Sequence, residues 1–112
     1  MAVASQAIRR GQVFLVRLDP MLGSEIKKTR PCVVVSPDEL NEHLRTVIVA
    51  PMTTGGRAYP WRPRCRCQGR AGFVALNQLR TVDVERLAKS LGQLEGSTVV
   101  AVLECLQDMF AE

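Results

Sequence analysis

Residues 10–37 read RGQVFLVRLDPMLGSEIKKTRPCVVVSP, and this stretch decides the fold. Residues 12–18 are rich in β-branched and aromatic side chains and end at Asp19-Pro20, so they predict a strand that stops at a turn. Residues 21–30 are polar and long for a hairpin connection, which is typical of a functional loop. Residues 32–35 form a short apolar run that predicts a second, buried strand.

The rest of the chain predicts further short strands and two helices. Ser36 followed by Pro37 predicts the start of a brief helix that ends near His43, with Ser36 as its N-cap. Ser97 is expected to cap a C-terminal amphipathic helix that packs on the sheet through apolar residues at helical spacing, Met109 and Phe110 among them. Further strands are expected at residues 46–50, 59–67, 72–76, 79–83 and 86–91, with a turn at Gln68-Gly69.

These elements predict an α+β architecture that is mainly β. Five to seven short strands would form a curled antiparallel sheet or small barrel, with one short and one longer helix. The length of 112 residues suits one domain, and 46% hydrophobic with 23% charged residues is ordinary globular composition. We expect a disordered leader at residues 1–9 and a single domain at residues 10–112.

The sequence favours a cytoplasmic protein. Its longest uncharged run, residues 46–56, is too short and too broken by proline and glycine to span a bilayer. The first ten residues lack the apolar core of a secretory signal. We therefore expect no membrane association.

Charge is distributed unevenly along the chain, whose net charge is +4. No acidic residue lies between Glu42 and Asp83, and a one-sign segment of this length indicates a polyanionic partner. Arginine favours bidentate contacts with phosphate, although a solubilising hairpin is the alternative. The arginines of this segment are Arg45, Arg57, Arg62, Arg64, Arg66, Arg70 and Arg80.

The residues that usually carry enzyme chemistry are scarce. Cys32 and Cys105 lie in apolar runs and are expected to be small buried hydrophobes, whereas Cys65 and Cys67 are expected at an exposed strand edge. With His43 as the one histidine, neither a metal site nor a Ser-His-Asp triad is predicted. Catalysis would have to use arginine, hydroxyl, carboxylate or backbone groups, and no cofactor is expected.

Three polar segments flank predicted strands, at residues 23–31, 51–56 and 76–80. Functional side chains often lie at strand ends, where a rigid sheet orients them. The alternative is ordinary turn chemistry, in which Thr53 and Thr54 bond to local backbone. From spacing alone, both interpretations remain open.

The order of these segments resembles the MazF/PemK family, the toxins of bacterial toxin–antitoxin modules. The resemblance extends from about residue 10 to residue 110. It implies a small, strongly bent SH3-like barrel with a C-terminal helix that forms a homodimer. It also implies a metal-independent endoribonuclease that cuts single-stranded RNA at short sequences, leaves 2′,3′-cyclic phosphate and 5′-hydroxyl ends, and is silenced by a MazE-like antitoxin. The matching segments are residues 10–16, 18–20, 23–25, 30–37, 51–56 and 76–83.

The resemblance also assigns roles to individual residues. Arg30 matches the family's catalytic arginine, Thr53 its catalytic threonine, and Glu25 the glutamate of its Gly-Ser-Glu loop. Ser24 and Asn77 stand where the PemK branch has histidine and aspartate, so the loop favours a MazF-type site. The identity of the general base stays open, with Glu25 as our hypothesis.

Contacts with RNA are expected from both basic and amide side chains. Cationic residues in the first loop and after Thr54 would follow the phosphate backbone, while amides and Arg80 would bond base edges. Tyr59 and Trp61 are expected in core or dimer packing. The expected RNA-binding set is Ser24, Lys27, Lys28, Thr54, Arg57, Asn77, Gln78 and Arg80.

Two alternatives of other classes remain. A CcdB-like toxin would poison gyrase without cutting anything, and a plain RNA-binding module would bind RNA without products. The sequence leaves open the cleavage site and whether messenger, ribosomal or transfer RNA is the target.

Overall fold

The apolar runs of the first two strands supply side chains to both faces of one sheet. Successive strand residues point to opposite faces. Accordingly, Phe14 and Val34 belong to one buried cluster, whereas their neighbours Val13 and Val33 belong to another. Both faces of this part of the sheet are therefore covered, which explains why the runs are continuously apolar rather than alternating.

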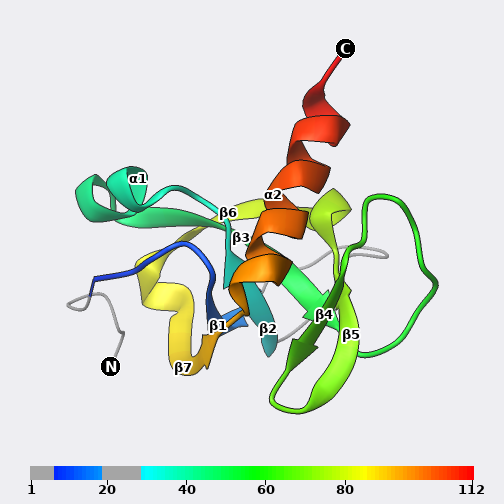
Figure 1. Ribbon diagram of the computed structural model, residues 1–112. Coiled ribbons are helices and arrows are strands. Elements are labelled where there is room, and N and C mark those ends of the chain that lie inside the picture. The colour runs from blue at the N-terminus through cyan, green and yellow to red at the C-terminus, as the bar shows by residue number, and fades with distance from the viewer. Residues whose placement is uncertain (1–6, 19–28) are drawn as a thin grey trace.

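A computed structural model describes residues 7–18 and 29–112, which form a bent antiparallel sheet with two helices (Figure 1). The strands occur in the order β4-β5-β3-β2-β1-β7, and β6 also pairs with β3. The expected curled antiparallel sheet with a C-terminal helix is confirmed. The strands are β1 (Gln12–Arg17), β2 (Thr29–Val34), β3 (Thr46–Thr53), β4 (Arg64–Cys67), β5 (Arg70–Val74), β6 (Arg80–Asp83) and β7 (Leu87–Gln93). The α-helices are α1 (Asp38–His43) and α2 (Gly96–Phe110), and the short 3₁₀ helices are η2 (Leu76–Gln78) and η3 (Val84–Arg86).

The strand expected at residues 59–67 is wrong in its first half. Pro60 and Pro63 have no N–H to give to a ladder, and the Arg62 N–H donates to the Tyr59 carbonyl to close a turn instead. Only Arg64–Cys67 forms strand β4. The expected turn at Gln68-Gly69 is confirmed, since both residues have positive φ, at 51° and 80°, as a tight two-residue hairpin requires.

Both expected helix caps are wrong. Helix α1 ends at His43 as expected, but it begins at Asp38 with Pro37 as its N-cap, so Ser36 does not cap it. Helix α2 begins at Gly96 with Glu95 as its N-cap, and the Glu95 carbonyl accepts the first helical hydrogen bonds, so Ser97 lies in the first turn.

Helix α2 packs on one face of the sheet as far as Cys105 and Leu106, and its last turn does not. Val102 is buried in the second core cluster, but Phe110 is 74% exposed, because the last turns extend past the sheet (Figure 1). The expectation that Met109 and Phe110 pack on the sheet is therefore wrong. Within the described residues, neither helix is long and apolar enough to cross a membrane.

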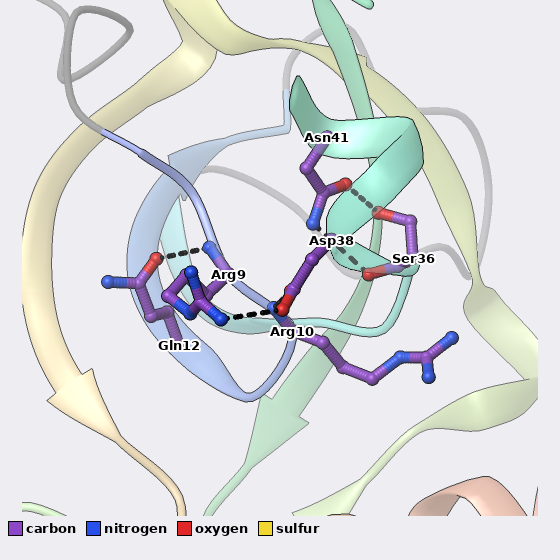
Figure 2. A network of polar contacts seen from close by, with 6 residues as sticks. All are labelled: Arg9, Arg10, Gln12, Ser36, Asp38 and Asn41. Carbon is purple, nitrogen blue, oxygen red and sulfur yellow. Dashed lines mark hydrogen bonds and ion pairs between the residues drawn. The ribbon is translucent and has the colours of Figure 1, made fainter. Parts of the chain in front are cut away.

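Two residues ahead of residue 10, Ile8 and Arg9, contact the folded part of the chain. Ile8 is buried in the first core cluster. Arg9 forms an ion pair with Asp38 at 3.0 Å, and the Arg10 N–H donates to the same carboxylate at 2.7 Å (Figure 2). These contacts hold residues 9 and 10 against the first turn of α1.

Ser36 and Asn41 form a buried hydrogen-bond network between β2, α1 and β3 (Figure 2). The Ser36 hydroxyl donates to the Asn41 Oδ1 at 2.6 Å and accepts from the Ile48 N–H at 3.0 Å. The Asn41 Nδ2 donates back to the Ser36 carbonyl at 3.1 Å. Ser36 therefore fixes where α1 sits on the sheet, in place of the capping role expected for it.

We predict that Ser36→Ala destabilises the protein by about 1–3 kcal/mol, because it leaves the buried Asn41 and Ile48 groups without their partner. Urea unfolding at one fixed protein concentration measures the change. Ser97→Ala removes an exposed hydroxyl and should change stability by less than about 0.5 kcal/mol. Equal effects of the two substitutions would contradict this account.

Gly72 lets the β4–β5 hairpin approach β3 closely. A Cβ atom at this position would collide with the backbone carbonyl oxygen of Thr53. The neighbouring pairs Met52–Val74 and Thr53–Phe73 lie in register on β3 and β5. A side chain at Gly72 is therefore excluded by space rather than by backbone conformation.

We predict that Gly72→Ala destabilises the protein by about 1–3 kcal/mol, because the hairpin must move away from rigid backbone. The matched control is Gly96→Ala, which adds the same methyl group in open space. Urea unfolding compares the two. If Gly72→Ala were as stable as the control, the hairpin could move away from β3 without loss of folding free energy, and this explanation would be wrong.

Candidate active site

The register of β2 against β3 brings two of the predicted site residues together. Cys32 lies opposite Pro51, Val33 opposite Ala50 and Val34 opposite Val49. Continued two residues beyond the Cys32–Pro51 pair, the same register places Arg30 opposite Thr53. Opposite residues of antiparallel strands share a face. Both residues do line one pocket.

This pocket has a volume of about 390 Å³ and is positively charged. Two guanidiniums, those of Arg30 and Arg70, contribute to its wall, and no acidic residue does so within the described residues. The floor is the end of β3, and the β4–β5 hairpin forms one side. The lining residues are Arg30, Pro31, Met52, Thr53, Thr54, Cys65, Cys67, Gln68, Arg70 and Gly72.

Arg30 is exposed at the start of β2. Among the described residues, no carboxylate pairs with its guanidinium. The planar arrangement of its donors suits two phosphate oxygens at once.

The hydroxyl of Thr53 is held in a local bond. It donates to the Gly55 carbonyl at 3.1 Å, the turn contact that the sequence raised as an alternative. The half-buried side chain nevertheless lines the pocket, and a hydroxyl can rotate to donate elsewhere. Thr53 can therefore both form the local turn bond and donate its hydroxyl to a molecule in the pocket.

The two buried thiols, those of Cys32 and Cys65, are poor nucleophiles. Burial, together with the neighbouring Cys67, raises the pKa of Cys65 to about 11. Burial raises the pKa of Cys32 to about 12, although the Arg80 and Arg30 guanidiniums act to lower it. The expected burial of Cys32 is confirmed, but the expected exposure of Cys65 is wrong because that side chain points into the second core cluster.

Cys105 also differs from its expected role as a buried hydrophobe. It is half-buried, and its thiol donates to the Pro60 carbonyl at 3.1 Å. The same segment places Tyr59 and Trp61 face to face, with ring centroids 4.9 Å apart and 38% of each residue exposed. The expectation that these two aromatic residues pack in the core is therefore wrong.

The other predicted RNA-binding residues divide into three groups. Thr54 lines the pocket, whereas Arg57, Asn77, Gln78 and Arg80 do not. Asn77 accepts from the Arg62 Nε at 3.4 Å, and Arg80 donates to the Leu18 carbonyl at 3.1 Å, so both are engaged within the protein. Ser24, Lys27 and Lys28 lie outside the described residues, and so does Glu25, the third predicted catalytic residue.

His43 is not part of the pocket. It ends α1, where its exposed ring lies 2.8 Å from the Glu39 carbonyl through Nδ1. This contact supports the interpretation of His43 as an ordinary surface residue.

Sequence reasoning missed the contribution of the β4–β5 hairpin. Gln68, Arg70 and Gly72 all line the pocket. A second pocket of about 500 Å³ shares Thr54, Cys65 and Gly72 with the first, and it adds Arg64 and Arg66. The signal available in the sequence was the run of arginines around Gln68-Gly69, but only the pairing of β5 with β3 shows where they face.

Comparison of the sequence with known proteins identifies a family. The profile of PemK-like, MazF-like toxins of type II toxin–antitoxin systems matches residues 9–110. Endoribonuclease MazF of Staphylococcus epidermidis is 34% identical over 101 residues, which cover 85% of this chain and 84% of that protein. Endoribonuclease PemK of Escherichia coli is 43% identical over 89 residues, which cover 70% of this chain and 62% of PemK.

Solved structures show the same fold. MazF from Deinococcus radiodurans superposes with a TM-score of 0.80 at 23% identity, over 93% of this chain and 96% of that one. A MazE–MazF complex from the same organism gives 0.76 at 19% identity, over 95% of this chain and 97% of the matched chain. The resemblance drawn from motif order is thus confirmed by sequence and by fold. The chain belongs to the PemK-like, MazF-like toxins of type II toxin–antitoxin systems.

Proposed function

We propose that the protein is a sequence-specific, metal-independent endoribonuclease that cleaves single-stranded RNA and leaves 2′,3′-cyclic phosphate and 5′-hydroxyl ends. The observation that carries this proposal is that Arg30 and Thr53 line the same cationic pocket. Within the described part of the chain, no acidic residue lines it. Relatives of the chain that are named endoribonucleases support the same activity.

The proposed reaction needs no nucleophile from the protein. The ribose 2′-oxygen attacks the adjacent phosphate, so the site has to orient that attack and stabilise the added negative charge. Arg30 grips two phosphate oxygens, and Thr53 turns its hydroxyl from Gly55 toward the same phosphate. Arg70, on the opposite wall, adds positive charge where the phosphorane forms.

The proton of the 2′-hydroxyl requires an acceptor. A guanidinium is too basic to serve, because it does not deprotonate in proteins. Burial raises the pKa of the Cys32 and Cys65 thiols well above neutral, so these two thiols do not serve either. We propose Glu25, a carboxylate five residues before Arg30, as the acceptor or as the group that orients Arg30.

The proposed partners follow from the charge of the site. RNA and the acidic tail of a MazE-like antitoxin would compete for the same cationic pocket. Relatives of this fold have been solved with MazE, which supports the antitoxin assignment. We further propose that the toxin acts in the cytoplasm as a homodimer.

We predict that Arg30→Ala lowers the cleavage rate by roughly 10²–10³-fold, the usual effect of removing one group that stabilises transition-state charge. The assay is cleavage of a long unstructured RNA in EDTA, with the 2′,3′-cyclic ends identified. Arg45→Ala is the matched control, since Arg45 is exposed, pairs with Glu85 and lies outside the pocket.

Other outcomes would assign a different function. A folded, antitoxin-free protein that leaves RNA intact would favour the CcdB-like alternative, to be tested by gyrase inhibition. Salt-sensitive RNA binding without products would favour a plain binding module. Cleavage that stops in EDTA and returns with a divalent ion would overturn metal independence.

We predict that Glu25→Gln slows cleavage and removes the acid limb of the pH–rate profile, because an amide cannot accept the proton. The measurement is the single-turnover rate across pH for the parent and the variant. A full rate with an unshifted acid limb would exclude Glu25 as the base.

A further inference from the structure

Two cysteines line the pocket but have no role in the proposed cleavage. Cys65 and Cys67 are two residues apart on β4, and alternate residues of a strand share a face. Both line the pocket with Arg30 and Thr53. The proposed substrate phosphate would therefore bind in the same pocket that these two cysteines line.

Of the four cysteines, Cys67 is the one that reaches the pocket and stays accessible. Cys32 and Cys65 are buried, whereas Cys67 and Cys105 are half-buried. The Cys105 thiol is engaged with the Pro60 carbonyl and has the Asp108 carboxylate nearby, which repels anions. Burial raises the pKa of Cys67 as well, so its reaction is slower than that of an exposed thiol.

The pocket favours anionic reagents of moderate size. Its volume of about 390 Å³ lies within the usual range for small-molecule sites, roughly 300–1,000 Å³. The guanidiniums of Arg30 and Arg70 attract carboxylates. Among the described residues, no acidic side chain lines the pocket to repel them. A disulfide that carries carboxylates is thus drawn to the place where the Cys67 thiol lies.

We propose that Cys67 is a modification site for small anionic disulfides, and that the mixed disulfide fills the pocket and excludes RNA. The Cys67 thiolate attacks one sulfur of the disulfide R–S–S–R, which forms Cys67–S–S–R and releases R–S⁻, which then takes up a proton. Excess thiol reverses the exchange. The exclusion of RNA rests on the proposed function, whereas the modification itself does not.

The mixed disulfide should persist rather than resolve into a Cys65–Cys67 bond. Alternate residues of a strand are roughly 6.7 Å apart along the backbone, at the upper limit of usual disulfide spans, and their Cβ atoms point in parallel. Cys65 also stays protonated, since its pKa is about 11. Release of the modification therefore requires an external thiol.

The test treats the full-length protein with oxidised glutathione, an anionic disulfide, and in parallel with cystamine, a cationic one. Peptide mass spectrometry maps the modified cysteines, and each sample is compared with its own untreated portion for RNA cleavage. We expect glutathione chiefly on Cys67, with cleavage lost in proportion to the modified fraction and restored by dithiothreitol. Cys67→Ser should abolish the loss, and Cys105→Ser should leave it intact.

The outcomes separate the two parts of the inference. Modification mainly at Cys105, or equal labelling of Cys67 by both reagents, would overturn the site. Glutathione on Cys67 with undiminished cleavage would overturn the exclusion of RNA. An untreated protein that cleaves no RNA would contradict the proposed function, and the mapping alone would then decide the modification site.

Discussion

Strand β3 is the element on which the rest of the structure depends, because it changes partners along its length. Its first half pairs with β6, up to Val49, and its end pairs with β5, from Met52. The change occurs around the buried Pro51, which has no N–H to donate, and its carbonyl accepts from the Ala75 N–H at 2.8 Å. The β4–β5 hairpin therefore pairs with the end of β3, beyond the part that β6 occupies.

This change of partner creates the pocket and sets its composition. The other edge of β3 stays with β2, whose register carries Arg30 toward Thr53. The hairpin adds Arg70 from the other side, and it comes close only because Gly72 has no side chain to meet the Thr53 carbonyl. A change at Gly72 would therefore act on the pocket without removing any group that touches RNA in the proposed mechanism.

The sequence was informative where local patterns decide structure. Apolar runs located β1, β2 and β3, and Gln68-Gly69 located the hairpin turn. Elsewhere, contacts between residues distant in sequence decided the structure against the local pattern. Ser36 bonds to Asn41 and Ile48 instead of capping a helix. Cys65 is buried by contacts with distant strands. Motif order predicted Arg30 and Thr53, but the walls contributed by the hairpin depend on the β3–β5 pairing, which no local pattern encodes.

The separation of charge along the chain survives folding at the first pocket for a topological reason, although Glu95 lines the second pocket. A hairpin joins residues that are close in sequence, so the arginines of β4 and β5 stay together around the pockets. The acids after residue 82 belong to other elements, where Asp83 accepts from the Glu85 N–H and Glu85 pairs with Arg45. Because these carboxylates lie outside the first pocket, they do not neutralise its field, which favours any phosphate or carboxylate that enters.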